Sequence, residues 1–160
     1  MDLGVHEWRR IYMYKSVDTT ISFLVKSLPR LYNDFYLEYI KSFIQNRNIN
    51  KTQVRALTFI KNYGSISMSE LCNMLNIEKG SLTSMIDDLE EKKYVERVKD
   101  KKDRRKYNIV LTEDGDKLAC EFLDYLKDEL HGKIDGIGHE SLEKFFDSMK
   151  VIINTMESID

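Results

Sequence analysis

The chain has 160 residues, of which 42% are hydrophobic and 32% charged, so it can bury the core of one globular domain and is not a disordered tail. One proline and seven glycines leave long stretches without turn signals, which favours helices over a many-turned β-sandwich. Two cysteines are too few for a disulfide framework. No apolar stretch approaches the ~18 residues of a membrane-spanning helix, and the N-terminus lacks the apolar segment of a secretory signal. We therefore expect a soluble, cytoplasmic, mostly helical protein.

Charge is unevenly distributed along the chain. The formal net charge is −2, but residues 1–112 carry 20 basic and 14 acidic residues, whereas residues 113–160 carry 5 basic and 13 acidic ones. Nine of the basic residues lie in the segment 92–106, against three acids. Such a segment produces a positive field that attracts phosphate, although a solvated surface loop has the same composition.

The first part of the chain has the periodicity of helices. Residues 5–46 place aromatic and aliphatic side chains at steps of three or four, as one face of a helix requires. Pro29 interrupts this run, which predicts a kink or a helix start near residues 27–29. A second helix is expected at 52–63, and Gly64 is well placed to end it.

Two short helices joined by a turn follow. Residues 65–67 can pair as a minimal strand, and Ser67 and Glu70 have the spacing of a capping box, in which each side chain satisfies a backbone donor at the start of a helix. The helix that begins there would bury four side chains, Met68, Leu71, Cys72 and Leu75. After a turn at 76–77, a further helix at about 79–92 would bury Leu82, Met85, Ile86 and Leu89. Two short helices joined in this way form a helix-turn-helix.

The pattern then changes to that of β-strands. Residues 94–98 and 107–111 have the composition and partial alternation of two strands, and the charged segment 99–106 lies between them. This order predicts a β-hairpin with a long basic tip directly after the helix-turn-helix. The fold class expected is therefore mainly α with a small β-hairpin, in the form of a winged helix-turn-helix.

Two helices are expected in the last third of the chain. Thr112 would cap a helix that runs to about Leu130, and acids in its first turn suit the helix dipole. Three glycines among residues 132–138 predict a loop, and a last helix would cover 140–156. The apolar stripes of both helices exceed what a chain with a small winged core can cover, which indicates a homodimer interface.

A winged helix of this composition suits duplex DNA. The exposed face of the helix at 79–92 would enter the major groove, where side chains reach base edges. The residues proposed to act there are Lys79, Gly80, Ser81, Thr83 and Ser84. The hairpin would bring basic side chains to the adjacent minor groove, whose negative potential attracts them. These side chains are Lys102, Arg104, Arg105 and Lys106.

Two segments resemble those of a known family. Residues 103–115, DRRKYNIVLTEDG, resemble the wing signature of MarR-type transcriptional regulators, which is an Asp-x-Arg, a strand ending in Leu-Thr and a glycine that opens the next helix. Residues 71–97 are similar to the family's helix-turn-helix and to its exit, Leu-Glu-x-x-x-x-Val-x-Arg. The order of elements matches along nearly the whole chain. The wing motif is fairly specific, whereas many folds contain a helix-turn-helix.

The resemblance implies a homodimer whose first and last helices interlock and whose two winged helices bind a pseudo-palindromic operator. It implies that Asp103 positions the wing through a salt bridge with Arg105, and that Arg104 and Arg105 are the minor-groove candidates. The family usually has Ser or Thr as the cap of the recognition helix and a basic residue on its DNA-facing side. This chain has Glu78 and Ser84 at those places, so we expect DNA binding to depend more on the wing.

The predicted division is a helical dimerisation part at 1–47, a winged helix-turn-helix at 48–112 and further dimerisation helices at 113–160. We predict a homodimeric regulator that binds operator DNA, with repression favoured over activation. A small aromatic effector is a candidate partner because the chain is rich in Tyr and Phe, but no ligand residue is singled out. The alternative is a winged-helix adaptor that uses the hairpin on an acidic protein partner and does not bind DNA.

Other chemistry has little support in the sequence. Cys72 is expected to pack in the core, and redox sensing at Cys120 is the less favoured interpretation of that residue. The three histidines have no ligand at a metal-binding spacing, and the chain contains neither a phosphate-binding glycine loop nor a nucleophile motif. We therefore expect no metal, no cofactor, no enzymatic activity and no membrane association.

Overall fold

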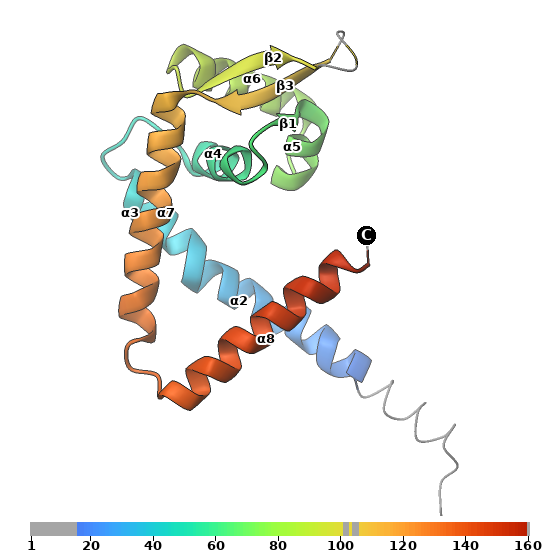
Figure 1. Cartoon of the computed structure of the whole chain (residues 1–160), viewed down its shortest axis with the longest axis vertical. Coiled ribbons are helices and arrows are strands. Elements are labelled where there is room, and N and C mark those ends of the chain that lie inside the picture. The colour runs from blue at the N-terminus through green and yellow to red at the C-terminus, as the bar shows by residue number, and fades with distance from the viewer. Residues whose placement is uncertain (1–15, 101–102, 104–105, 160) are drawn as a thin grey trace, which may run out of the picture. The chain divides into compact units, whose positions relative to one another are not determined.

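The computed structural model describes residues 16–100, 103 and 106–159 of the chain (Figure 1). It divides into two compact units, Met1–Leu123 and Asp124–Asp160. The first unit contains a small sheet and most of the helices, and the second contains the end of one long helix and one further helix. The predicted mainly α-helical fold with a small β-hairpin is confirmed. The domain boundaries predicted at 47/48 and 112/113 remain a prediction.

The first described segment is helical from residue 16 to Ile44 and contains two π-helical turns, η1 (Phe23–Ser27) and η2 (Asn33–Leu37). The α-helices α2 (Leu28–Tyr32) and α3 (Glu38–Ile44) follow them in turn. Pro29 lies in the first turn of α2, but the chain is helical on both sides, so the predicted interruption near residues 27–29 takes the form of a change from a π-helical turn to an α-helical one.

Helix α4 (Lys51–Tyr63) begins the winged-helix region, one residue earlier than predicted. The Asn50 side chain caps it by accepting hydrogen bonds from the backbone N–H groups of Thr52 (2.9 Å) and Gln53 (3.0 Å). The Gln53 side chain in turn accepts a hydrogen bond from the N–H of Asn50 (2.9 Å). Gly64 has a φ of +71°, which glycine adopts without strain, and it ends the helix as predicted.

The predicted helix-turn-helix consists of α5 (Met68–Leu75) and α6 (Lys79–Glu91). The capping box of Ser67 and Glu70 is present, with the Glu70 N–H donating to the Ser67 hydroxyl at 3.2 Å. Asn76 takes the left-handed conformation, with φ of 53°, and thereby ends α5. Five of the eight side chains predicted inward are buried, namely Leu71, Leu75, Leu82, Ile86 and Leu89. The other three, Met68, Cys72 and Met85, are only half-buried because they lie at the edges of the apolar faces.

Three antiparallel strands form the sheet in the order β1 (Ile66–Ser67), β3 (Tyr107–Leu111), β2 (Val95–Lys99). Ile109 of the central strand pairs with Ile66 on one side and with Arg97 on the other, and it is fully buried. The predicted minimal strand and hairpin are thus confirmed. The hairpin places its loop at one end of the sheet, beyond the pair formed by Lys99 and Tyr107 (Figure 1).

Helix α7 (Glu113–Ile134) is joined to the sheet through a close backbone contact. The Thr112 hydroxyl accepts a hydrogen bond from the Gly115 N–H at 3.1 Å, which confirms the predicted cap. Gly115 is buried against Tyr94, and a Cβ atom at this glycine would lie 1.8 Å from the Tyr94 carbonyl oxygen. Only glycine therefore fits at position 115, in the first turn of α7.

The end of α7 differs from the prediction. The helix continues to Ile134, past the predicted end at Leu130, and the loop is shorter than the predicted 132–138. Gly132 lies within the helix because a single glycine costs only about 1 kcal/mol there, which is too little to stop a helix of 22 residues. The last helix, α8 (His139–Glu157), lies close to the predicted bounds.

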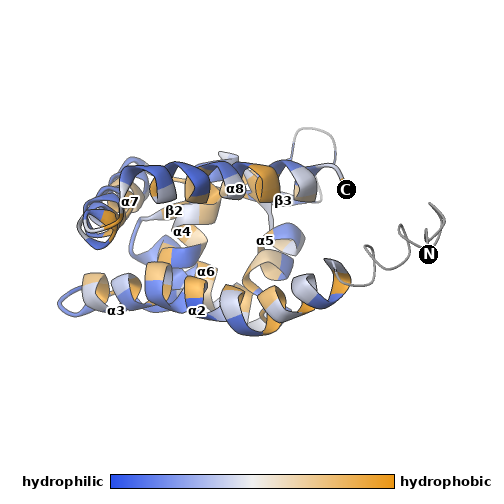
Figure 2. Ribbon diagram, turned by 90° about the horizontal axis from the view of Figure 1, so that it is seen from below, coloured by the Kyte–Doolittle hydropathy of each residue, from blue (hydrophilic) through white to orange (hydrophobic). Residues whose placement is uncertain are grey.

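Large apolar side chains are exposed on the first helical segment and on α8, and Figure 2 shows hydrophobic residues interspersed with hydrophilic ones along both. On the first segment they are Val17, Ile21, Leu24, Val25, Leu28 and Tyr32. On α8 they are Phe146, Val151, Ile152, Ile153 and Met156, and this helix buries none of its residues. No described helix is both long enough and apolar enough to cross a bilayer.

Candidate nucleic-acid interface

The first half of α6 presents small polar side chains to solvent. The residues predicted for base contact on this helix are all exposed, namely Lys79, Gly80, Ser81, Thr83 and Ser84. Leu82, Ile86 and Leu89 hold the opposite face of the helix in the core. These side chains are therefore accessible, and their contact with DNA stays a prediction.

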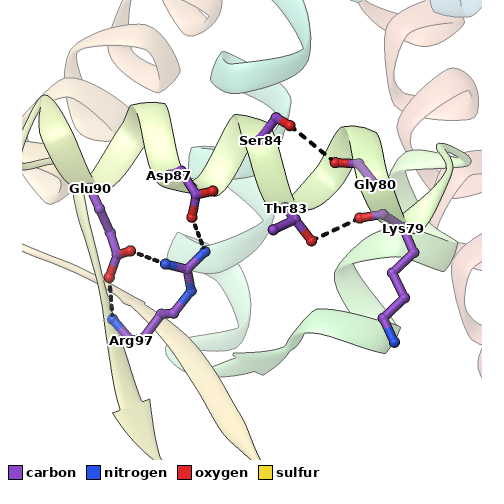
Figure 3. A network of polar contacts seen from close by, with 7 residues as sticks. All are labelled: Lys79, Gly80, Thr83, Ser84, Asp87, Glu90 and Arg97. Carbon is purple, nitrogen blue, oxygen red and sulfur yellow. Dashed lines mark hydrogen bonds and ion pairs between the residues drawn. The ribbon is translucent and has the colours of Figure 1, made fainter.

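Two hydroxyl groups on this face are held by the helix itself. The Thr83 hydroxyl donates to the Lys79 carbonyl at 3.0 Å, and the Ser84 hydroxyl donates to the Gly80 carbonyl at 3.3 Å (Figure 3). Each oxygen keeps lone pairs that can accept a hydrogen bond from an outside donor. An exposed hydroxyl with a fixed orientation is suited to select a donor on a base edge.

The start of α6 has no side-chain cap. Glu78 occupies the N-cap position, but its carboxylate accepts no hydrogen bond from the first-turn amides. These amides point out of the start of the helix, where the helix dipole favours an anion. Beside them, a shallow cavity of about 350 Å³ is lined by residues at the start of α4, in the turn before α6 and on α6, namely Asn50, Lys51, Thr52, Ile77, Ser81 and Met85. The polar surface around Ser81 thus extends onto α4.

The base of the wing is organised by Asp100, a residue that sequence reasoning missed. Its carboxylate accepts hydrogen bonds from the backbone N–H of Asp103 (2.8 Å) and from the side-chain amide of Asn108 (3.1 Å). Its own N–H donates to the carbonyl of Lys106 at 3.0 Å. An aspartate at the first position of a loop commonly bonds to the backbone two or three residues later, and that signal was present in the sequence.

Of the residues predicted to act in the wing, the structure describes Asp103 and Lys106. Lys106 is exposed at the end of the loop, and the Asp103 carbonyl accepts a hydrogen bond from its N–H at 2.8 Å. Lys102, Arg104 and Arg105 lie outside the described residues, and so does the predicted salt bridge between Asp103 and Arg105. The roles given to these residues therefore stay predictions.

The second half of α6 carries acids that are paired with bases, and sequence reasoning assigned these acids no partner. Arg97 of β2 donates through Nη2 to Asp87 at 2.6 Å, through Nη1 to the Glu90 carboxylate, and through its backbone N–H to Glu90 at 3.1 Å (Figure 3). Asp88, on another side of the helix, pairs with Lys92 at 2.7 Å and accepts a hydrogen bond from the buried Gln53 of α4. The hydrogen bond from Lys92 lowers the pKa of Asp88, with a smaller contribution from Gln53.

The two cysteines are half-buried and free. The Cys72 thiol donates to the Ile77 carbonyl at 2.8 Å, a structural contact within the helix-turn-helix. The Cys120 sulfur lies 3.9 Å from the Asp116 carboxylate, which also pairs with Lys61 at 2.6 Å. Redox sensing at Cys120 remains the less favoured interpretation. Among the residues that the structure describes, no three potential metal ligands gather.

Comparisons with known proteins agree with this geometry. The profile of the MarR family matches residues 49–107, which include α4 to β2 and the wing. Over 102 residues the chain is 30% identical to the HTH-type transcriptional repressor MdtR of Bacillus subtilis; the match covers 64% of this chain and spans only 65% of the repressor. This relative is a regulator of transcription, which agrees with the expectation that the chain is not an enzyme.

Solved structures show the same fold. A MarR family protein from Bacillus stearothermophilus is 21% identical, with a TM-score of 0.73 over 88% of this chain and 97% of that one. FabT of Streptococcus pneumoniae, solved in complex with DNA, is 20% identical, with a TM-score of 0.66 over 88% of this chain and 99% of that one. The predicted winged-helix fold is therefore confirmed.

Proposed function

The chain belongs to the MarR family of winged-helix proteins, and from this premise we propose that it is a homodimeric regulator of transcription that binds specific DNA sequences. The observation that carries the proposal is the exposed polar half of α6, which lies on the same small domain as a hairpin with a strongly basic loop. One α-helix fits the major groove, and a basic hairpin suits the phosphates and the minor groove beside it.

In this proposal α6 and the wing have different tasks. Lys79, Gly80, Ser81, Thr83 and Ser84 contact the major groove and determine which sequence is bound. Lys102, Arg104, Arg105 and Lys106 bind phosphate and the minor groove, and Asp103 holds Arg105 in place. FabT, which shares the fold, has been solved with DNA, and this supports the assignment of a DNA-binding role to the fold here.

The proposed homodimer is supported by the exposed apolar side chains of the first helical segment and of α8. A monomer that exposes two such stripes would lose the stabilisation that burial of apolar surface provides. A two-fold dimer would place two recognition helices ~34–36 Å apart, as a pseudo-palindromic operator requires. We propose that the dimer acts in the cytoplasm.

Repression is favoured because the relative MdtR is a transcriptional repressor. A small aromatic effector would relieve repression only if it bound the DNA-free arrangement more tightly than the DNA-bound one, since equal affinities shift no population. Support for an aromatic ligand comes from a cluster of aromatic rings in the first unit. Tyr36 lies 5.4 Å from Tyr32 and 5.9 Å from Phe122, centroid to centroid, and burial raises the pKa of Tyr36.

The test is an electrophoretic shift with the DNA next to the protein's own gene, titrated with salt and repeated with random duplex. We expect affinity to fall steeply with salt, because binding to phosphate releases counterions. Arg105→Ala should weaken binding to both duplexes by about tenfold and reduce the salt slope by about one. Ser84→Ala should weaken binding to the specific duplex alone. If neither duplex binds at low salt, the DNA-binding proposal is wrong and the adaptor becomes the better hypothesis.

A further inference from the structure

Arg97 connects two elements that the proposed function uses together. It belongs to β2, the strand that enters the wing, and its guanidinium lies against α6 (Figure 3). There it bridges two carboxylates, Asp87 and Glu90, one turn apart on the helix. The Arg97 N–H also donates to Glu90 at 3.1 Å, so backbone and side chain of one residue are both fastened to the helix.

The stabilisation that these ion pairs give to the fold is small. The side chain of Arg97 is 27% exposed and that of Asp87 is 59% exposed, and ion pairs near the surface contribute little to folding stability. A planar guanidinium bridging two carboxylates does, however, fix the geometry of the groups that it joins. The contribution of this cluster is therefore the orientation of β2 relative to α6.

The charge of the cluster supports this interpretation. Two carboxylates and one guanidinium give a net charge of −1 on a helix proposed to enter the groove of a polyanion. Electrostatics alone would make these acids unfavourable for DNA binding, so removing one of them would be expected to raise affinity. A positioning role has the opposite consequence, because loss of either acid would loosen the wing.

We propose that Arg97, held by Asp87 and Glu90, is a positioning residue that fixes the wing relative to the recognition helix, so that both reach DNA as one rigid unit. The proposal rests on the proposed DNA-binding function, and it assigns these three residues no contact with DNA. The gain is entropic: two contacts that are already correctly spaced cost less conformational freedom on binding than two independent ones.

Whether a Glu90 substitution lowers or raises DNA affinity distinguishes a positioning role from simple electrostatic repulsion. Glu90→Gln should weaken binding about three- to tenfold to a duplex of ~30 base pairs that the wild-type protein selects from a random library. Its salt slope should be unchanged because no phosphate contact is removed. The control is Glu91→Gln, an exposed acid on the same helix whose carboxylate pairs with no described residue. It should bind as the wild type does or slightly tighter.

Combining substitutions tests the coupling. Arg97→Lys keeps the charge but removes the planar guanidinium that bridges the two carboxylates. It should therefore weaken DNA binding as Glu90→Gln does. The double variant should lose little more than either single variant, because both break one interaction. Melting temperatures should shift by no more than about 3 °C, which would show that the fold is retained. The proposal is overturned if Glu90→Gln binds as tightly as Glu91→Gln, or if the two losses add fully.

A second measurement needs no DNA. Hydrogen exchange of the hairpin, residues 95–111, should be faster in Glu90→Gln and in Arg97→Lys than in Glu91→Gln. Unchanged exchange would overturn the positioning role even if every variant bound DNA. If the wild type binds no duplex but exchange changes as expected, the proposed function fails while the mechanical link between β2 and α6 holds.

Discussion

The winged-helix region and helix α8 differ in how much of their apolar surface the chain itself covers. In the first, side chains such as Leu71, Leu82 and Ile109 are fully buried. In the second no residue is buried, and Val151, Ile153 and Met156 are each more than half exposed. One region has its own core, whereas the other is an amphipathic helix that needs a covering surface, since packing of the apolar face provides most of a helix's stability.

The largest expected effect tests the tightly packed side of this contrast and compares two glycines of α7, one packed against the winged-helix region and one in open space. Gly115→Ala would place a Cβ 1.8 Å from the Tyr94 carbonyl oxygen, and backbone on both sides would have to move. We expect a loss of about 3 kcal/mol in the free energy of unfolding, as for other substitutions that overpack a core. Denaturant unfolding followed by circular dichroism measures it.

The matched control lies later on α7. Gly132→Ala has open space within 4 Å of the new Cβ and should stabilise the helix by up to about 1 kcal/mol. Equal effects of the two substitutions would contradict the tight contact between α7 and the sheet.

The second test addresses the exposed side of the comparison. Ile153→Glu would place a charge on the apolar stripe of α8 and should weaken the proposed dimer about 100-fold, since a buried unpaired charge costs several kcal/mol. Light scattering across a range of protein concentrations measures the change. Ser148→Glu adds the same charge at an exposed polar position of α8 and should leave the dimer intact. A wild-type protein that stays monomeric at every concentration would contradict the dimer.

Local signals explain what was predictable from the sequence. The start of α5 at Ser67, the end of α4 at Gly64 and the cap of α7 at Thr112 each depend on residues within four positions, and all three predictions are confirmed. The predicted end of α7 is too early because the glycine signal for a loop is weak against the continuing hydrogen bonds of a long helix.

The ion pairs of α6 were not predictable in the same way. Asp87 and Arg97 are ten positions apart and lie on different elements, so their contact depends on how β2 packs on α6. Nothing in the local sequence around Asp87 indicates this partner. Asp100 was closer to prediction, since its contacts with Asp103 and Asn108 lie within the same hairpin.

The smallest expected effect is the pH dependence of folding stability that Glu70 gives to the winged-helix region. The Ser67 hydroxyl at 2.6 Å, and then the Ser67 N–H at 3.0 Å, lower the pKa of the Glu70 carboxyl. Since the folded-state pKa lies below the unfolded value of about 4.3, the ionised carboxylate stabilises the fold above that pH, and this contribution is lost as the pH falls through the folded-state pKa.

Glu70→Gln should therefore cost about 0.5 kcal/mol at pH 7, the lower range for an exposed cap, and the cost should shrink toward pH 3. Unfolding free energies of the two proteins measured from pH 7 to about pH 3 give the difference directly. Ser67→Ala removes the hydroxyl that lowers the pKa, so its stability should depend less on pH over the same range. Parallel profiles for the wild type and Glu70→Gln would show that the capping box contributes no ionisation-dependent stability.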